Sequence, residues 1–178
     1  RVGALAGRAQ KADVEARIAA IAGDVVPVFD GAAMEIEAEA PERGAFLPPA
    51  LYRCTDPDAA DAVHRIEAFG PVATLLPYRD LSHATDLANR GGGSLVASLI
   101  THDPGVASQM VQEAGAWHGR IYINDRDSMA EATGHGSPLP HMIHGGPGRA
   151  GGGEELGGIR GVLHYMQRVA VQGSPRML

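Results

Sequence analysis

Apolar residues along the chain follow two alternating periods, which predict helices and strands in turn. The segment 9–22 has the pattern of an amphipathic helix, because Val14, Ile18 and Ile21 fall on one face. Further helices are predicted from Asp56 toward Glu67, over 82–90 with Ala84, Leu87 and Ala88 inward, and over 104–117. Strands are predicted at 25–29, 50–53, 71–78, 95–101 and 120–124.

The order of these elements indicates the fold class. The run 95–101 is apolar without interruption, as expected of a parallel strand whose two faces are covered, and 71–78 also has a mostly buried pattern. Strands and helices alternate through the middle of the chain, which predicts a layered α/β arrangement with parallel strands. The acidic stretch 35–43 is predicted to be a solvated turn or hairpin, and no linker divides the chain.

Composition narrows the class of protein further. The chain has 178 residues, 44% of them hydrophobic, which suits one domain with a core. Its apolar runs are too short to cross a bilayer, and its arginines are scattered at a net charge of −6, which argues against membrane and nucleic-acid partners. A single cysteine favours a reducing cytoplasm. Because the chain opens without methionine, we expect a piece of a longer protein.

The run Glu67-Ala68-Phe69-Gly70-Pro71-Val72 is the most informative motif. It resembles the E-x-F-G-P-V signature of the NAD(P)-dependent aldehyde dehydrogenases. The resemblance implies that Glu67 binds the ribose hydroxyls beside the nicotinamide and that Phe69 packs against the nicotinamide end of the cofactor. A carboxylate suits the first task, since it accepts two hydroxyl hydrogen bonds. The alternatives are an ordinary surface carboxylate for Glu67 and a core aromatic for Phe69.

Other segments resemble the same family in the same order. They are Gly3-Ala4-Leu5 with Gln10, Gly44-Ala45-Phe46 with Pro49, Ala88-Asn89 with Gly93-Ser94-Leu95, and Gly119–Asn124. Typical members have P-F-G-G-x-K-x-S-G near the C-terminus, whereas this chain has Gly134–Pro140 and His144–Gly158. That departure resembles the semialdehyde dehydrogenases of aerobic phenylacetate and benzoate degradation, the first of which is joined to a MaoC-type hydratase domain. It implies a CoA-thioester semialdehyde as substrate and NADP, or NAD, as cofactor.

The resemblance also implies a domain organisation. Residues 1–160 would be the C-terminal part of a three-layer α/β catalytic domain, and 161–178 a helix followed by an oligomerisation strand and tail. We expect the strand around Val169–Val171 to pair with a neighbouring subunit of a homo-oligomer, because an open apolar edge invites aggregation. The alternative is a strand in the chain's own sheet.

No catalytic residue is assigned within the chain. The family needs a cysteine nucleophile well upstream of the Glu67 motif and a separate glutamate base, whereas Cys54 lies just before the motif. Arg53 and His64 could activate a thiol, yet a lone cysteine in an apolar strand is more often inert. We therefore expect the isolated chain to lack dehydrogenase turnover. A non-catalytic binding or assembly module derived from the family is the alternative.

Two other patterns are judged not to be sites. Gly146–Gly151 satisfies G-x-G-x-x-G, but the prolines of the preceding segment break the strand that a dinucleotide fingerprint requires. A turn-rich loop or, by resemblance, a segment bordering the substrate tunnel are the two interpretations. His135, His141 and His144 have no carboxylate or cysteine at a ligand spacing, so no metal site is predicted.

Overall fold

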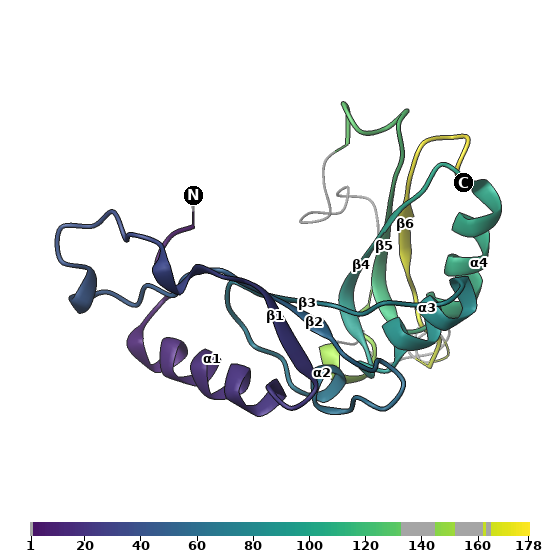
Figure 1. The fold of residues 1–178 in the computed structure, drawn as a ribbon. Helices are drawn as coiled ribbons and strands as arrows, with labels where there is room; N and C mark the ends of the chain where they lie inside the picture. The colour runs from purple at the N-terminus through teal and green to yellow at the C-terminus, as the bar shows by residue number, and fades with distance from the viewer. Residues whose placement is uncertain (1, 133–144, 152–161, 163–164) are drawn as a thin grey trace. The chain divides into compact units, whose positions relative to one another are not determined.

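The computed structural model describes residues 2–132, 145–151, 162 and 165–178, and it divides them into two compact units (Figure 1). The first unit ends at Tyr78 and the second begins at Arg79. No change of composition marks this division in the sequence. The domain boundary expected at residue 160 follows the family resemblance and stays a prediction.

The first unit contains a mixed three-stranded sheet with one long helix. Strand β2 lies in the centre, antiparallel to β1 and parallel to β3. Val14 and Ile21 of the long helix are buried and Ile18 is half-buried, which confirms the predicted apolar face. The elements are α1 (Arg8–Ile21), β1 (Val25–Asp30), β2 (Ala50–Cys54), α2 (Ala62–Arg65) and β3 (Val72–Leu75), with 3₁₀ turns at Gly31–Ala33 and Pro41–Arg43.

Two predictions for this unit need correction. The helix predicted from Asp56 is helical only over Ala62–Arg65. Asp56 caps a single turn that the N–H of Ala60 closes, and the N–H groups of residues 61–63 then donate to the Asp24 carboxylate instead of continuing that turn as a helix. The strand predicted over 71–78 as mostly buried covers only Val72–Leu75, and its residues are alternately half-buried and exposed. The acidic stretch 35–43 is the expected solvated turn, with one 3₁₀ turn at its end.

The second unit contains a three-stranded parallel sheet with the order β4-β5-β6, which confirms the parallel α/β prediction. Figure 1 shows α3 and α4 on the same side of this sheet. Its core is formed by Ala107, Ile121, Ile123 and Met177. The elements are α3 (Leu81–Asn89), β4 (Ser94–Ile100), α4 (Pro104–Ala114), β5 (His118–Asn124), a 3₁₀ turn (Gly148–Ala150) and β6 (Ala170–Gln172).

The apolar pattern predicts that both faces of the strand at 95–101 are covered, but the structure buries both faces of β5 instead. Leu95 and Ile100 of β4 are 56% and 82% exposed, because β4 lies at the edge of the described sheet. The central strand β5 is buried from His118 to Ile123. In α3, Leu87 is buried as predicted, whereas Ala88 is exposed.

The last strand also differs from its prediction. Ala170–Gln172 pairs in parallel with β5 of the chain's own sheet, with Ala170 opposite Arg120. The alternative of a strand in the chain's own sheet is therefore correct for this edge of β6, and pairing of its other edge with a neighbouring subunit stays a prediction. The physical reason is that β5 offers a free edge within the same unit. Of the helix predicted after Gly161, residues 163–164 lie outside the described residues, and residues 165–168 form a turn followed by irregular backbone, so the helix does not continue there.

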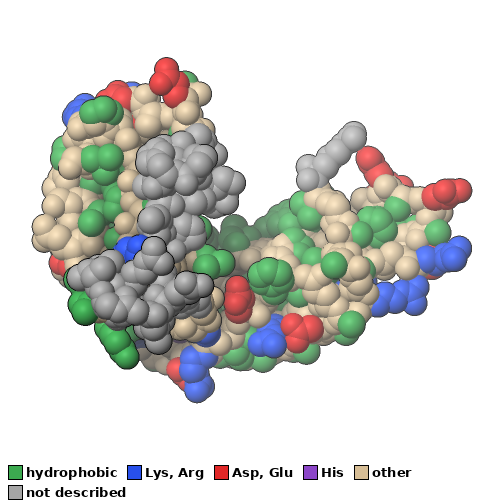
Figure 2. Space-filling model, turned by 180° about the vertical axis from the view of Figure 1, so that it is seen from behind, with side chains coloured by type: hydrophobic (Ala, Val, Ile, Leu, Met, Phe, Trp, Pro, Cys, Tyr) green, Lys and Arg blue, Asp and Glu red, His purple; other side chains and the backbone are tan. Residues whose placement is uncertain are grey.

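The surface carries charges of both signs. Figure 2 shows acidic and basic side chains interspersed on the face that it displays. Among the described helices, none has both the length and the apolar character needed to cross a membrane.

Candidate functional site

The Glu67 motif forms the loop between α2 and β3 of the first unit. Glu67 is exposed and the Phe69 side chain is 71% exposed, so Phe69 is not a core aromatic of this chain. The backbone is held in tight turns, since the N–H of Gly70 donates to the carbonyl of Ala68 and the N–H of Val72 donates to that of Gly70, each over 2.8 Å. The two candidate side chains therefore project from a hydrogen-bonded loop.

Gln10 of α1 connects the start of its helix to this loop. Its Nε2 donates to the carbonyl oxygen of Phe69 over 2.9 Å, and its Oε1 accepts from the N–H of Ala6 over 3.0 Å. Both ends of the amide are thus satisfied, which fixes the orientation of the side chain. The carbonyl between Phe69 and Gly70 is held in place by a residue 59 positions earlier in the sequence.

Gly70 packs directly against the buried side of α1. A Cβ atom at this position would lie 3.0 Å from both methyl carbons of Val14, which is itself fully buried. That separation is closer than carbon atoms normally approach. A side chain at this point of the motif would therefore have to displace Val14, so packing favours glycine here.

Asp24 determines where the short helix before the motif begins. Its Oδ2 accepts from the N–H groups of Asp61, Ala62 and Val63 at 3.3, 2.9 and 3.4 Å. The N-cap residue Asp61 makes no such bond with its own side chain. Asp24 thus supplies the missing acceptor for the free N–H groups of α2.

Cys54 lies in an environment that deactivates a thiol. It is fully buried at the end of β2. Burial raises the pKa of this thiol, a hydrogen bond from the backbone of Asp56 lowers it, and the carboxylates of Asp24 and Asp56 raise it again. The neighbouring Arg53 is exposed. The thiolate needed for nucleophilic attack is disfavoured in this position, which supports the interpretation of Cys54 as inert.

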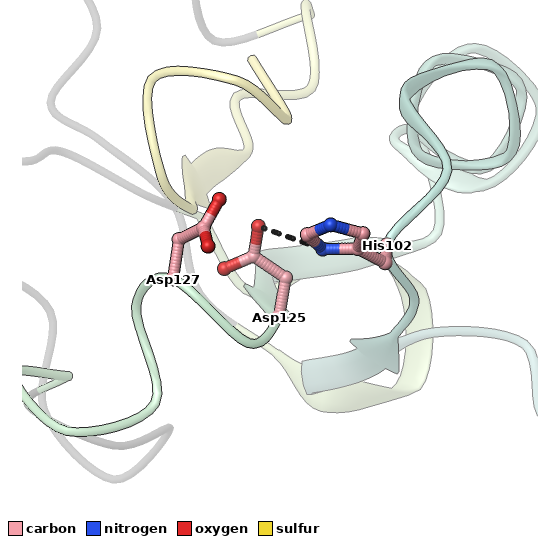
Figure 3. Close-up of side chains that lie close together, drawn as sticks. All are labelled: His102, Asp125 and Asp127. Atoms are coloured by element: carbon pink, nitrogen blue, oxygen red, sulfur yellow. Dashed lines mark ion pairs between the residues drawn. The ribbon is translucent and has the colours of Figure 1, made fainter.

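A charged cluster that the sequence analysis missed lies in the second unit (Figure 3). It contains His102, Asp125 and Asp127, whose ligand atoms lie within 4.8 Å of one another. These residues follow the carboxyl ends of β4 and β5, and Ser174 follows that of β6. The sequence could have pointed to this cluster through the predicted parallel strands, because parallel strands present their carboxyl ends at one edge of a sheet.

Asp125 is the buried centre of this cluster. Its Oδ2 accepts from the hydroxyl of Ser174 over 2.6 Å, and its Oδ1 accepts from the hydroxyl and the N–H of Ser128 over 2.7 and 2.9 Å. The bond from Ser174 is the main cause that lowers the pKa of Asp125 to about 2, with burial opposing it and the Ser128 bonds adding to it. The carboxylate is therefore charged and saturated with donors.

The hydrogen bonds of the cluster argue against both a metal centre and a serine nucleophile. Nη1 of Arg176 lies 2.5 Å from Nε2 of His102, and a guanidinium can only donate. The neutral ring then carries its proton on Nδ1, 3.8 Å from Oδ2 of Asp125, where a metal would need a lone pair. Ser174 bonds to the carboxylate and not to an imidazole, unlike the serine of a catalytic triad. The cluster fastens the C-terminal segment to the sheet.

Other predicted features fall partly outside the described residues. His135, His141 and His144 lie there, as do the segments 134–140 and 152–158. Within 145–151 the chain forms the 3₁₀ turn Gly148–Ala150, whose Arg149 N–H donates to the carbonyl of Gly92, and the position of this segment beside a substrate tunnel stays a prediction. A cavity of about 550 Å³ in the first unit is lined by residues 2–3, 34–37 and 46–49, and the Glu67 motif does not line it.

Comparison with known proteins decides the family. The sequence model of the aldehyde dehydrogenase family matches residues 1–171. The chain belongs to the aldehyde dehydrogenase family. It is 54% identical over 177 residues to Protein MaoC of Klebsiella aerogenes, covering 99% of this chain and 52% of that protein. It is 39% identical over 149 residues to 3,4-dehydroadipyl-CoA semialdehyde dehydrogenase of Aromatoleum evansii, covering 83% of this chain and 29% of that enzyme.

Solved structures of aldehyde dehydrogenases share the fold. The crystal structure of an NAD-dependent aldehyde dehydrogenase from Sinorhizobium meliloti has a TM-score of 0.66 and 26% identity, covering 92% of this chain and 29% of that one. The chain thus spans about half of one curated relative and less than a third of the other. The expected α/β fold class of the aldehyde dehydrogenase catalytic domain, with a parallel sheet, is confirmed for the part that it spans.

Proposed function

We propose that this chain is the C-terminal part of the catalytic region of an NAD(P)-dependent aldehyde dehydrogenase that oxidises a CoA-linked semialdehyde to the acid in aerobic aromatic degradation. Two relatives support this proposal: Protein MaoC, and an enzyme whose name specifies a CoA-linked semialdehyde. In this proposal the reacting thiol belongs to the rest of the protein, so the isolated chain is inactive. Homo-oligomeric assembly and an adjoining hydratase domain stay predictions from the resemblance.

The exposed carboxylate of Glu67 is the observation that carries the assignment. It makes no hydrogen bond or ion pair with another described residue, so both oxygens are available to a ligand. Two vicinal ribose hydroxyls match such a carboxylate, because a charged acceptor strengthens each bond. The ring of Phe69 is likewise uncovered and suits an apolar wall for a planar nicotinamide. The residues present fit the cofactor.

The cofactor supplies the hydride acceptor when it is bound. The chain's own contribution is positional. Glu67 fixes the ribose, and Phe69 limits the places that the attached ring can occupy. Hydride transfer requires reacting atoms at near-attack distance, so this restriction accelerates the reaction without taking part in bond making.

The support beneath the loop serves the same purpose. Gln10 holds the carbonyl of Phe69, and Gly70 rests on Val14. The motif follows α2, and Asp24 caps the N-terminus of that helix. A binding residue is most effective when its backbone is fixed before the ligand arrives, and each of these contacts fixes part of the motif.

Steady-state kinetics of the full-length protein tests the proposal. Glu67→Gln keeps the size of the side chain and removes its charge, so we expect KM for the nucleotide to rise and the rate of hydride transfer to fall. Glu39→Gln, at another exposed glutamate of the same unit, is the matched control and should behave as the wild type. Equal kinetics for all three proteins would refute the role of Glu67 and favour a non-catalytic assembly module.

The substrate class has a separate test. We expect kcat/KM for a CoA-linked semialdehyde to exceed that for a free aliphatic aldehyde of similar chain length. Equal values for the two aldehydes would remove the CoA thioester from the proposal. The family assignment would stand, because it does not depend on the substrate.

A further inference from the structure

The parallel sheet of the second unit has one apolar face and one polar face. Ile121 and Ile123 of β5 point to the core beside α4, so the alternate residues of β5 occupy the opposite face. The register places side chains of β4 and β6 beside them on that face. This polar face contains Ser94, His118, Arg120, Tyr122, Asn124 and Gln172.

Arg120 lies at the centre of the polar face and has no counter-charge among the described residues. Its side chain is only 1% exposed, and none of its three guanidinium nitrogens has a hydrogen-bond partner in the described part of the chain. Its neighbours in the register are Val96 and Ala170, which are apolar. Burial lowers the pKa of this guanidinium. A buried cation without a partner is strongly unfavourable, so an anion would stabilise this position.

His118 presents a lone pair on the same face. The hydroxyl of Ser94 donates to the carbonyl of Val96 over 3.2 Å, so its oxygen accepts from Nδ1 of His118 over 2.7 Å. Burial lowers the pKa of His118, which keeps the ring neutral. Its Nε2 is therefore an acceptor, and no described residue donates to this buried atom.

Two further buried acceptors on this face are unpaired within the ranges that the structure describes. They are Oδ1 of Asn124 and Oε1 of Gln172. Asn124 is four residues along β5 from Arg120, about 13 Å at the strand spacing. The acceptors near the guanidinium are therefore Nε2 of His118 and Oε1 of Gln172, each two residues from it in the register. A ligand that satisfies both kinds of group must carry negative charge and hydroxyl hydrogens together. A monohydrogen phosphate does so, whereas a carboxylate offers only acceptors.

We propose that the polar face of the second sheet is a phosphate-binding site in which Arg120 is the anchor and His118 accepts a phosphate hydroxyl. A planar guanidinium binds two phosphate oxygens at once, which adds geometric specificity to the attraction between the charges. The phosphate comes either from the free ion or from a phosphorylated compound such as coenzyme A. The site does not depend on the role of Glu67, which lies in the other unit.

Isothermal titration calorimetry on the full-length protein tests this site. Orthophosphate and coenzyme A are titrated in turn at constant ionic strength, with acetate as the carboxylate comparison. We expect saturable phosphate binding in the wild type, at least tenfold weaker binding in Arg120→Met, and unchanged binding in Arg126→Met, which removes an exposed arginine. Binding of coenzyme A but not of orthophosphate, lost with Arg120→Met, identifies the phosphorylated compound as the source.

The proposal is overturned if neither phosphate probe binds, if acetate binds as tightly as phosphate, or if binding survives Arg120→Met. Thermal unfolding in phosphate-free buffer adds an independent check. Because Arg120→Met removes an unpaired buried charge, its unfolding temperature should equal or exceed that of the wild type. A clear fall would show that contacts within the folded chain already stabilise the Arg120 side chain, which also overturns the proposal.

Discussion

Nε2 of Gln10 donates to the carbonyl oxygen of Phe69 over 2.9 Å and so joins the first helix to the motif loop. Gln10→Ala removes this bond, whose net worth is about 1 kcal/mol. If the bond positions the cofactor loop, KM for the nucleotide in the full-length enzyme should rise about fivefold while the folded state persists. Exposed Arg17→Ala on the same helix is the control. An unchanged KM for Gln10→Ala would limit its role to packing.

The close approach of Gly70 to Val14 gives a stability prediction. A methyl group at position 70 would lie 3.0 Å from both methyl carbons of Val14, so Gly70→Ala should lower the free energy of unfolding by about 1–3 kcal/mol. Val14→Ala makes room for that methyl group, so the double variant should lose less than the sum of the two single variants. Urea denaturation of all four proteins measures the coupling. Simple additivity would contradict the packing explanation.

Asp24 gives a second stability prediction, since its carboxylate accepts hydrogen bonds from the N–H groups of the N-cap residue Asp61 and of Ala62 and Val63 in α2. Asp24→Ala should cost about 0.5–2 kcal/mol of unfolding free energy, the usual range for a lost cap. Asp24→Asn keeps an acceptor oxygen and should cost less. Denaturant titration compares the two variants, and equal losses would show that the negative charge matters more than the cap.

Asp125 predicts how stability depends on pH. Hydrogen bonding, first from Ser174, lowers its pKa from 3.8 to about 2 in the folded state. A depressed pKa means that the unfolded chain binds the proton more readily, so the stabilisation is present above about pH 4 and is lost as the pH falls toward 2. Ser174→Ala should make this acid-dependent loss smaller. Unfolding temperatures measured between pH 2 and 6 test it, and identical profiles would contradict the assigned cause.

Cys54 gives a negative prediction. Because its thiol is fully buried and its pKa is raised, maleimide should label it only after unfolding. Cys54→Ala in the full-length enzyme should retain dehydrogenase turnover. Loss of turnover in a correctly folded Cys54→Ala protein would show that this sulfur takes part in the reaction and would overturn its assignment as inert.

The sequence predicts the elements well where periodicity alone decides them. Helix α1 has the expected face at Val14 and Ile21, and β5 follows its alternating pattern. Periodicity fails where a distant side chain takes the backbone N–H groups, as Asp24 does for residues 61–63. Periodicity also cannot distinguish an edge strand from a central one. The apolar residues of β4 therefore predicted a buried strand, whereas the structure buries β5 and leaves β4 partly exposed.

The candidate site also contains residues that the sequence reveals and residues that only the folded structure brings together. The Glu67 motif is contiguous, so its residues could be found by reading the chain, although Gln10 and Asp24 support it from distant positions. The His102 cluster joins the ends of three strands and becomes visible only with the sheet topology. Arg120 has no partner among the described residues. This property depends on the three-dimensional surroundings of the side chain, and the spacing of residues along the sequence does not reveal it.

Equilibrium titration of the full-length protein with reduced nucleotide, followed by nicotinamide fluorescence, tests the central role of Glu67 most directly. A hydrogen bond to a charged group contributes about 1.5–3 kcal/mol, so Glu67→Gln should weaken binding by about 10-fold to 100-fold. Glu39→Gln should leave the affinity unchanged. Wild-type affinity in Glu67→Gln would contradict the cofactor-binding role of Glu67, because the exposed carboxylate would then hold no nucleotide.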